Sequence, residues 1–97
     1  MRLFDWDQRK AAANERKHGV SFEQAMEAFE DANAVVMADD DHSDDEELRE
    51  RLIGLSSKGV LLVVFVVRDH DDGDVKRIIS ARKATRKEKE VYATTHR

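Results

Sequence analysis

The segment Val60-Leu61-Leu62-Val63-Val64-Phe65-Val66-Val67 decides the fold. It is an unbroken run of leucine, β-branched and aromatic residues, and Gly59 precedes it. A short apolar run that is bounded by glycine is typical of a central strand covered on both faces. We therefore expect Val60–Val67 to form the centre of a β-sheet.

The neighbouring segments predict further strands. Polar and apolar residues alternate in Glu47–Leu55, and Ser56–Gly59 has the composition of a hairpin turn. Gly73 lies in a second turn, which leads into Val75–Ala81. Strands joined by such short turns must be antiparallel, because a parallel crossover needs about a dozen residues. A short strand at Ala34–Ala38 completes a four-stranded, mainly antiparallel sheet.

Two helices are predicted before the sheet. Asp7 can cap a helix over Gln8–His18, and Gly19 can end this helix in the left-handed conformation. Ser21 and Gln24 form a capping-box pattern that opens a second helix. Its apolar residues recur at helical spacing, namely Phe22, Ala25, Met26 and Phe29. We expect the two helices to form a hairpin with one buried side.

A third helix is predicted at the end of the chain, where Thr85 and Glu88 form another capping box. The predicted class is therefore α+β, with an N-terminal helix hairpin, a four-stranded sheet and a C-terminal helix, in one domain over residues 1–97. The sequence has no cysteine, so a hydrophobic core must hold the fold. No apolar run approaches the roughly 20 residues of a membrane span, and a cytoplasmic location is expected.

Charge is distributed unevenly along the chain, whose formal net charge is −4. Residues 39–50 hold eight acidic residues and one basic residue, whereas residues 76–97 hold eight basic and two acidic residues. The chain outside the acidic segment can therefore present a basic face to phosphate groups. Alternatively, these charges are only a solvated surface.

Polar side chains form a stripe on the first predicted helix. Lys10, Asn14 and His18 are four residues apart and share one face, with Lys17 beside them. This stripe can contact a phosphate backbone. Alternatively, Asn14 and His18 bond backbone groups near the Gly19 turn and orient the two helices.

Arginines gather on the later strands. The two-residue period of a strand places Arg49 and Arg51 on the same side, where their planar guanidinium groups can hold a phosphate. Ordinary ion pairs with neighbouring acids are the alternative. In the last strand, strict alternation places Arg82 on one face and Arg77 on the other. More basic residues follow, namely Lys83, Arg86, Lys87 and Lys89.

If the phosphate held by these residues belongs to RNA, the chain could cleave it without a metal. Such cleavage needs a base for the 2′-hydroxyl, stabilisation of charge on the phosphate, and an acid for the leaving 5′-oxygen. Arginine suits the second role, and His18 or Tyr92 suits the first or third.

The acidic segment Asp39–Glu46 offers oxygen ligands for magnesium or calcium, although its spacing does not match an EF-hand loop. The other interpretation of this segment is a solvated loop. No Walker loop, dinucleotide fingerprint or zinc motif is present.

The chain resembles the BrnT toxin family over nearly its whole length. The resemblance begins with Phe4-Asp5-Trp6-Asp7, Lys10, Asn14 and Lys17-His18-Gly19-Val20-Ser21-Phe22-Glu23 with Ala25. It continues through Asp41-His42-Ser43, Glu47, Arg49 and Ile53-Gly54, and ends with Arg77-Ile78-Ile79-Ser80-Ala81-Arg82-Lys83-Ala84, Glu88 and Tyr92. The signatures at 17–22 and 78–84 are specific in combination. The chain differs from the family pattern in its acidic segment before Glu47 and in Arg51, where an apolar strand residue is expected.

This resemblance implies a RelE-like ribonuclease fold and inhibition of translation by RNA cleavage. It also implies a BrnA-like antitoxin whose ribbon-helix-helix part binds operator DNA, so that the toxin meets DNA only through the complex. Neither a cofactor nor a metal is expected. The candidate catalytic residues are His18, Arg49, Arg77, Arg82 and Tyr92, and the candidate RNA-binding residues are Lys10, Asn14, Lys17, Arg51, Lys83 and Arg86.

Two alternatives to a metal-independent ribonuclease remain at this point. In the first, the chain is a catalytically degenerate binding module that holds the antitoxin and assists repression of its operon. In the second, it is a metal-dependent nuclease that uses the acidic segment.

Overall fold

The computed structural model describes residues 4–39, 48–70 and 73–95. Its elements confirm the predicted α+β class, with one additional strand at the start. In chain order they are β1 (Phe4–Asp5), α1 (Gln8–His18), α2 (Phe22–Phe29), β2 (Val35–Ala38), β3 (Arg49–Ser56), β4 (Gly59–His70), β5 (Gly73–Lys83) and α3 (Arg86–Thr94).

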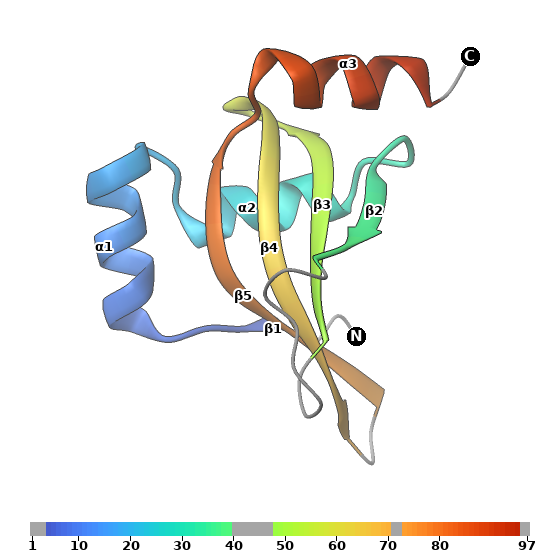
Figure 1. The fold of residues 1–97 in the computed structure, drawn as a ribbon. Coiled ribbons are helices and arrows are strands. Elements are labelled where there is room, and N and C mark those ends of the chain that lie inside the picture. The colour runs from blue at the N-terminus through green and yellow to red at the C-terminus, as the bar shows by residue number, and fades with distance from the viewer. Residues whose placement is uncertain (1–3, 40–47, 71–72, 96–97) are drawn as a thin grey trace.

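The sheet is mixed, with the strand order β1-β5-β4-β3-β2 (Figure 1). The predicted antiparallel pairing from β2 to β5 is confirmed. The prediction of four strands is wrong, because β1 pairs in parallel with the middle of β5. Phe4 lies opposite Lys76, and Asp5 lies opposite Arg77. The N-terminus is thus tied to a strand far along the chain.

The first two helices have the predicted caps but do not pack as a hairpin. The carboxylate of Asp7 accepts hydrogen bonds from the first turn of α1, and Gly19 ends this helix with φ 70°. Ser21 forms the predicted capping box with Gln24. However, α1 packs beside β5 whereas α2 crosses β3, β4 and β5 (Figure 1). The sheet therefore holds the two helices separately, and the predicted hairpin packing is wrong.

The main core lies between α2 and the central strands. Phe22, Ala25 and Ala28 of α2 are fully buried, together with Leu61 and Val63 of β4. Close packing also explains Gly54, because a Cβ atom at this position would lie 2.5 Å from the carbonyl oxygen of Ala28. None of the described helices is long and apolar enough to cross a membrane.

A β-bulge in β5 changes which side chains share a face of the sheet. Arg82, Ser80 and Arg77 pair with Leu62, Val64 and Val66 respectively, all on one face of β4. The register shifts by one residue between Val64 and Phe65, which leaves Ile79 as the extra residue on β5. The prediction that Arg77 and Arg82 lie on opposite faces is therefore wrong.

The side chain of Asn14 continues the hydrogen bonding of the sheet at the free edge of β5. Its amide oxygen accepts a bond from the Ala81 N–H at 3.1 Å, and its amide nitrogen donates to the Ala81 carbonyl at 2.7 Å. The nitrogen also donates to the carbonyl of Val20 at 3.0 Å. This contact fixes α1 and the turn that follows it against the sheet. It confirms the structural interpretation of Asn14.

Candidate functional site

The sheet face turned away from α2 carries arginines from two strands. Arg49 and Arg51 of β3 share this face with Arg77 and Arg82 of β5, because their partners on β4 all lie on one side. We call it the arginine face, defined by these four residues. The predicted common orientation of Arg49 and Arg51 is confirmed.

Arg49 and Arg77 form one row across the sheet. Both pair with Val66 of β4, which lies between them and is buried. Arg77 also forms an ion pair with Asp5, at 3.1 Å between Nη1 and Oδ2. Its side chain retains 28% exposure, so the guanidinium is held in place but remains partly open to solvent. Two partly buried arginines in one row can stabilise charge on a phosphate from two sides.

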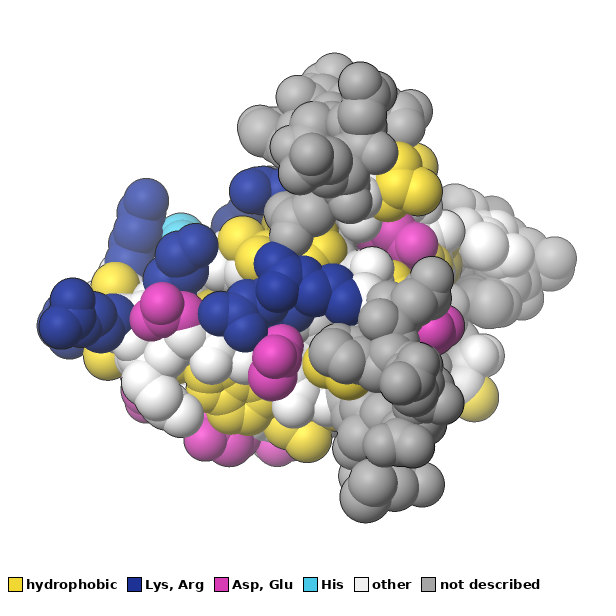
Figure 2. Space-filling view, turned by 90° about the horizontal axis from the view of Figure 1, so that it is seen from below, with side chains coloured by type: hydrophobic (Ala, Val, Ile, Leu, Met, Phe, Trp, Pro, Cys, Tyr) yellow, Lys and Arg dark blue, Asp and Glu magenta, His cyan; other side chains and the backbone are white. Residues whose placement is uncertain are grey.

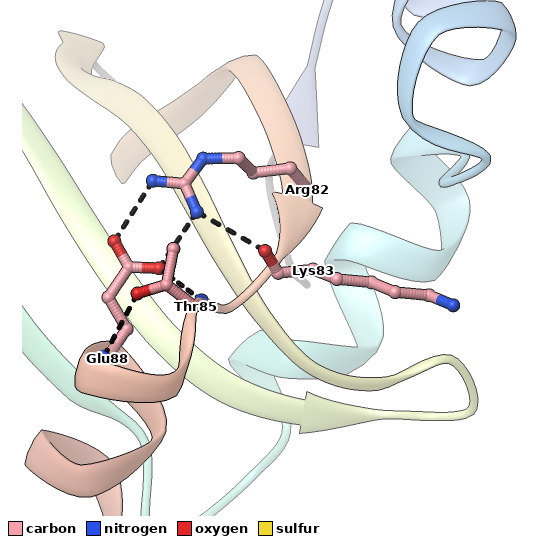
Figure 3. A network of polar contacts seen from close by, with 4 residues as sticks. All are labelled: Arg82, Lys83, Thr85 and Glu88. Carbon is pink, nitrogen blue, oxygen red and sulfur yellow. Dashed lines mark hydrogen bonds and ion pairs between the residues drawn. The ribbon is translucent and has the colours of Figure 1, made fainter.

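Arg82 is occupied by an internal ion pair (Figure 3). Its two terminal nitrogens donate to the two carboxylate oxygens of Glu88, at 2.8 and 3.0 Å. The same carboxylate accepts the Thr85 backbone N–H at the start of α3. The bonds from Arg82 lower the pKa of Glu88, and the Glu88 carboxylate raises the pKa of Arg82. In this arrangement Arg82 positions α3.

Tyr92 holds the other half of α3. Its hydroxyl donates to Oδ2 of Asp31 at 2.5 Å, and the same oxygen accepts the backbone N–H of Leu55 on β3. This hydrogen bond raises the pKa of the Tyr92 phenol, because the neutral form is the donor. Tyr92 therefore holds its proton more firmly than an ordinary tyrosine.

The five predicted catalytic residues do not meet at one point. Tyr92 is anchored near Leu55, six positions from Arg49 along β3, which corresponds to about 20 Å. His18 ends α1, which packs on the other side of the molecule at β5 (Figure 1). The arrangement brings Arg49 and Arg77 together, and it separates them from both predicted proton-transfer residues.

The predicted stripe on α1 is only partly available to a ligand. Lys10 and Lys17 are exposed, and His18 is half-buried. Asn14 is only 7% exposed and its amide is used by backbone groups, so we omit it from the proposed RNA surface. Figure 2 shows lysine and arginine side chains spread from the α1 side toward the middle of the molecule, with acidic side chains between them.

Basic residues that follow β5 are also solvent-exposed. Lys83 is exposed, and only its carbonyl oxygen contacts Arg82, at 3.3 Å. Arg86 is 96% exposed and lies 3.8 Å from Glu90 on the same helix. Such an exposed pair contributes little to stability and leaves the arginine accessible.

A cavity of about 330 Å³ lies between α3 and the arginine face. Its apolar wall is formed by Met37, Ile53, Leu62 and Val91. Arg51, Thr85, Lys87 and Glu88 complete the lining. This α3 cavity adjoins the Arg82–Glu88 pair.

The part of the chain that the structure describes contains no group of three His, Asp or Glu residues that could hold a metal ion. Most of the acidic segment, residues 40–47, lies outside the described residues, so the predicted loop and its metal alternative are not part of this geometry. Asp39 at its start is buried, and its N–H donates to the carbonyl of Arg49 at 2.8 Å.

A family model described as "ribonuclease toxin, BrnT, of type II toxin-antitoxin system" matches residues 6–88. The chain belongs to this BrnT family. A comparison with curated proteins found no match. Membership in a type II system gives this BrnT toxin an antitoxin as a partner. The matched range includes Arg49, Arg77 and Arg82, and it ends before Tyr92.

Several partners of the candidate residues were not predicted from the sequence. Asp5 was missed because its strand has only two residues, although the family resemblance began there. Asp31 gave no local signal as the partner of Tyr92, because the two residues are 61 positions apart. Glu88 was predicted only as a capping residue, whereas it also holds Arg82.

Proposed function

We propose that this BrnT toxin is a metal-independent endoribonuclease that inhibits translation, with a RelE-like fold and the arginine face as its RNA surface. The observation that carries this proposal is the row formed by Arg49 and Arg77 across the sheet. Arg49 and Arg77 place fixed positive charge on both sides of β4, which suits a phosphate at which negative charge develops during cleavage.

The proposal gives the candidate residues different roles. Arg49 and Arg77 stabilise charge on the phosphate, whereas Arg82 positions α3 through Glu88. Proton transfer is assigned to His18 or Tyr92, although the bond to Asp31 that raises the pKa of Tyr92 makes this phenol a weaker proton donor than an ordinary tyrosine. Exposed basic residues extend the RNA surface, namely Lys10, Lys17, Lys83 and Arg86.

The partner proposed for this toxin is a BrnA-like ribbon-helix-helix antitoxin. Operator DNA is then bound only through the antitoxin in the complex. We place the toxin in the cytoplasm, where both RNA and such a partner are present. The basic residues outside 39–50 provide a surface for a partner that carries acidic groups.

The first prediction concerns the double variant Arg49→Ala with Arg77→Ala. It should cleave RNA at least about 100-fold more slowly than the parent chain, because each lost charge stabiliser costs about 2–4 kcal/mol in comparable sites. The measurement is single-turnover cleavage of labelled RNA by antitoxin-free protein, in excess chelator.

Two controls separate chemistry from folding in this experiment. Arg16→Ala with Lys58→Ala removes two charges from exposed positions away from the row and should leave the rate within about twofold. Asp5→Asn breaks the ion pair to Arg77 but keeps the arginine, and should also retain cleavage. Equal cleavage rates for the arginine double variant and the parent would refute the role of the row. No cleavage by the parent would refute the enzyme proposal in favour of a binding module. Cleavage that stops in chelator would refute metal independence.

A further inference from the structure

The α3 cavity has features of a ligand site, and neither Arg49 nor Arg77 lines it. We propose that this cavity is a subsite for one nucleotide, with its phosphate on Arg51 and Lys87 and its base against the apolar wall. The inference rests on the proposed function in one respect, since the nucleotide is taken to belong to the RNA substrate.

Arg51 is the main observation. It lies on β3 between Met37 of β2 and Val64 of β4, and it faces the cavity. Its Nε atom is buried and has no hydrogen-bond partner. A buried donor without a partner costs free energy that a bound acceptor would recover. A phosphate oxygen is an acceptor that matches the planar, permanently charged guanidinium.

The charges around the cavity favour an anion. Arg51 and Lys87 contribute two positive charges to the lining, and Glu88 contributes one negative charge. The Glu88 carboxylate is already held by both terminal nitrogens of Arg82, so its charge is balanced at the wall. The first turn of α3, which begins after Thr85, also presents the positive end of the helix dipole to this side.

The size and the wall of the cavity favour a nucleotide over an isolated phosphate ion. Its volume of about 330 Å³ lies at the lower end of the range of small-molecule pockets, about 300–1,000 Å³. Met37, Ile53, Leu62 and Val91 give it an apolar surface that a base can cover. An inorganic anion would leave this apolar surface without a contact.

The position of Arg51 connects the cavity to the proposed RNA surface. Arg49 and Arg51 are two residues apart on one face of β3, which corresponds to about 7 Å along the strand. An RNA strand whose phosphate lies at the Arg49 and Arg77 row can therefore continue into the cavity. This continuity favours RNA over an acidic segment of the antitoxin as the occupant.

The experiment is a methyl NMR titration of the full, antitoxin-free chain with adenosine 5′-monophosphate, adenosine and inorganic phosphate in parallel. The four apolar residues of the wall each carry a methyl reporter. We expect the nucleotide to shift these methyl signals in a saturable way and to bind at least about tenfold more tightly than adenosine or phosphate alone. Equal affinity for the nucleotide and for either fragment would overturn the nucleotide assignment.

Variants of one residue test the role of Arg51. Arg51→Met keeps an unbranched side chain but removes the guanidinium, and should weaken nucleotide binding about tenfold or more. Arg51→Lys keeps the charge without Nε and should fall between the parent and Arg51→Met. Lys58→Ala, at the exposed turn before β4, should bind as the parent does. Unchanged methyl signals of Leu61 and Val63 in each variant show that the core is intact.

The titration tests the subsite and the cleavage assay tests the proposed function, so either proposal can be refuted without the other. If the nucleotide leaves the wall methyls unmoved while the Arg49 and Arg77 double variant loses cleavage, the subsite is refuted and the proposed function stands. If the nucleotide binds through Arg51 but the parent chain cleaves no RNA, the proposed function is refuted and the nucleotide site stands. Wall shifts caused by the antitoxin, with none caused by the nucleotide, also refute the subsite.

Discussion

The carboxamide of Asn14 occupies the part of the β5 edge that β1 does not reach. β1 pairs with Lys76 and Arg77, whereas Asn14 meets both backbone groups of Ala81 farther along the same edge. A side chain of α1 therefore takes the place of a neighbouring strand at this position. The buried backbone groups of Ala81 depend on it for their hydrogen bonds.

Asn14→Ala should lower the free energy of unfolding by about 2 kcal/mol, because it leaves buried backbone groups of Ala81 and Val20 without partners. The better helix propensity of alanine offsets part of this loss. Urea unfolding followed by circular dichroism measures the difference. Arg16→Ala on the same helix is exposed and should change the stability by no more than about 0.5 kcal/mol. An equal effect of the two substitutions would contradict the structural role of Asn14.

The orientation of Arg77 shows the limit of prediction from residue spacing. Alternation alone placed Arg49 and Arg51 correctly, because β3 pairs with β4 without interruption. It failed for Arg77 relative to Arg82, because the bulge at Ile79 depends on pairing with β4 and has no local signal such as glycine. The row of Arg49 and Arg77 therefore appears only in the folded sheet.

Helix α3 is held at its two ends by different chemistry. The helix has no fully buried residue among those described, so its position depends strongly on polar anchors. Glu88 is anchored to Arg82 at the start, and Tyr92 to Asp31 in the second half. Glu88, one of the two anchored residues, also lines the α3 cavity.

The two anchors of α3 should fail at opposite ends of the pH range. The folded pKa of Glu88 lies below its ordinary value of 4.5, so its stabilisation is complete above 4.5 and is lost as the pH falls through the folded value. The folded pKa of Tyr92 lies above its ordinary value of 10.0, so its stabilisation is complete below 10.0 and is lost as the pH rises through the folded value. Amide hydrogen exchange of α3, corrected for the intrinsic pH dependence, measures both losses.

Substitutions at the two anchors provide matched controls. Glu88→Gln should remove the acid-dependent change in protection but keep the alkaline one, and Tyr92→Phe should do the reverse. Protection of α3 that stays constant from pH 3 to pH 11 in the parent chain would contradict this assignment.

The elements themselves were largely predictable because their signals are local. Gln8–His18 matches the predicted helix, and the caps at Asp7, Ser21 and Thr85 are all present. β1 was not predicted because a two-residue strand has no periodicity and its partner lies more than 70 positions away. The packing of α1 beside β5 likewise depends on a contact between Asn14 and Ala81, which are distant in sequence.

At the scale of the whole molecule, the uneven charge distribution outweighs the net charge in the proposed RNA binding. The chain is acidic overall, yet eight of its 21 acidic residues lie within the twelve positions 39–50. Three residues of the arginine face, Arg51, Arg77 and Arg82, and the exposed lysines of α1 come from other parts of the chain, and Arg49 is the one basic residue within 39–50. A globally acidic protein can therefore bind a polyanion through one surface.

The affinity for RNA should fall steeply with salt. Contacts with three or four phosphates predict a slope of about −2 to −3 for log affinity against log salt, since each contact on a single strand contributes about −0.7. Fluorescence anisotropy with 2′-O-methyl RNA, which lacks the attacking hydroxyl, measures binding without cleavage. The Arg49→Ala with Arg77→Ala variant should have a slope shallower by about 1.4. Identical slopes for the variant and the parent would place the RNA elsewhere.

Ile79 is an extra residue in β5, and it reverses which alternate positions of the strand point to the arginine face. Before it, odd positions of β5 point to the arginine face, and after it even positions do. Without this bulge, Ile79 would lie opposite Phe65 and Arg77 opposite Val67, so Arg77 would face the core instead of lying in the row with Arg49. The position of one unpaired residue in β5 therefore decides whether the proposed catalytic charge of Arg77 lies beside Arg49 or on the core face of the sheet.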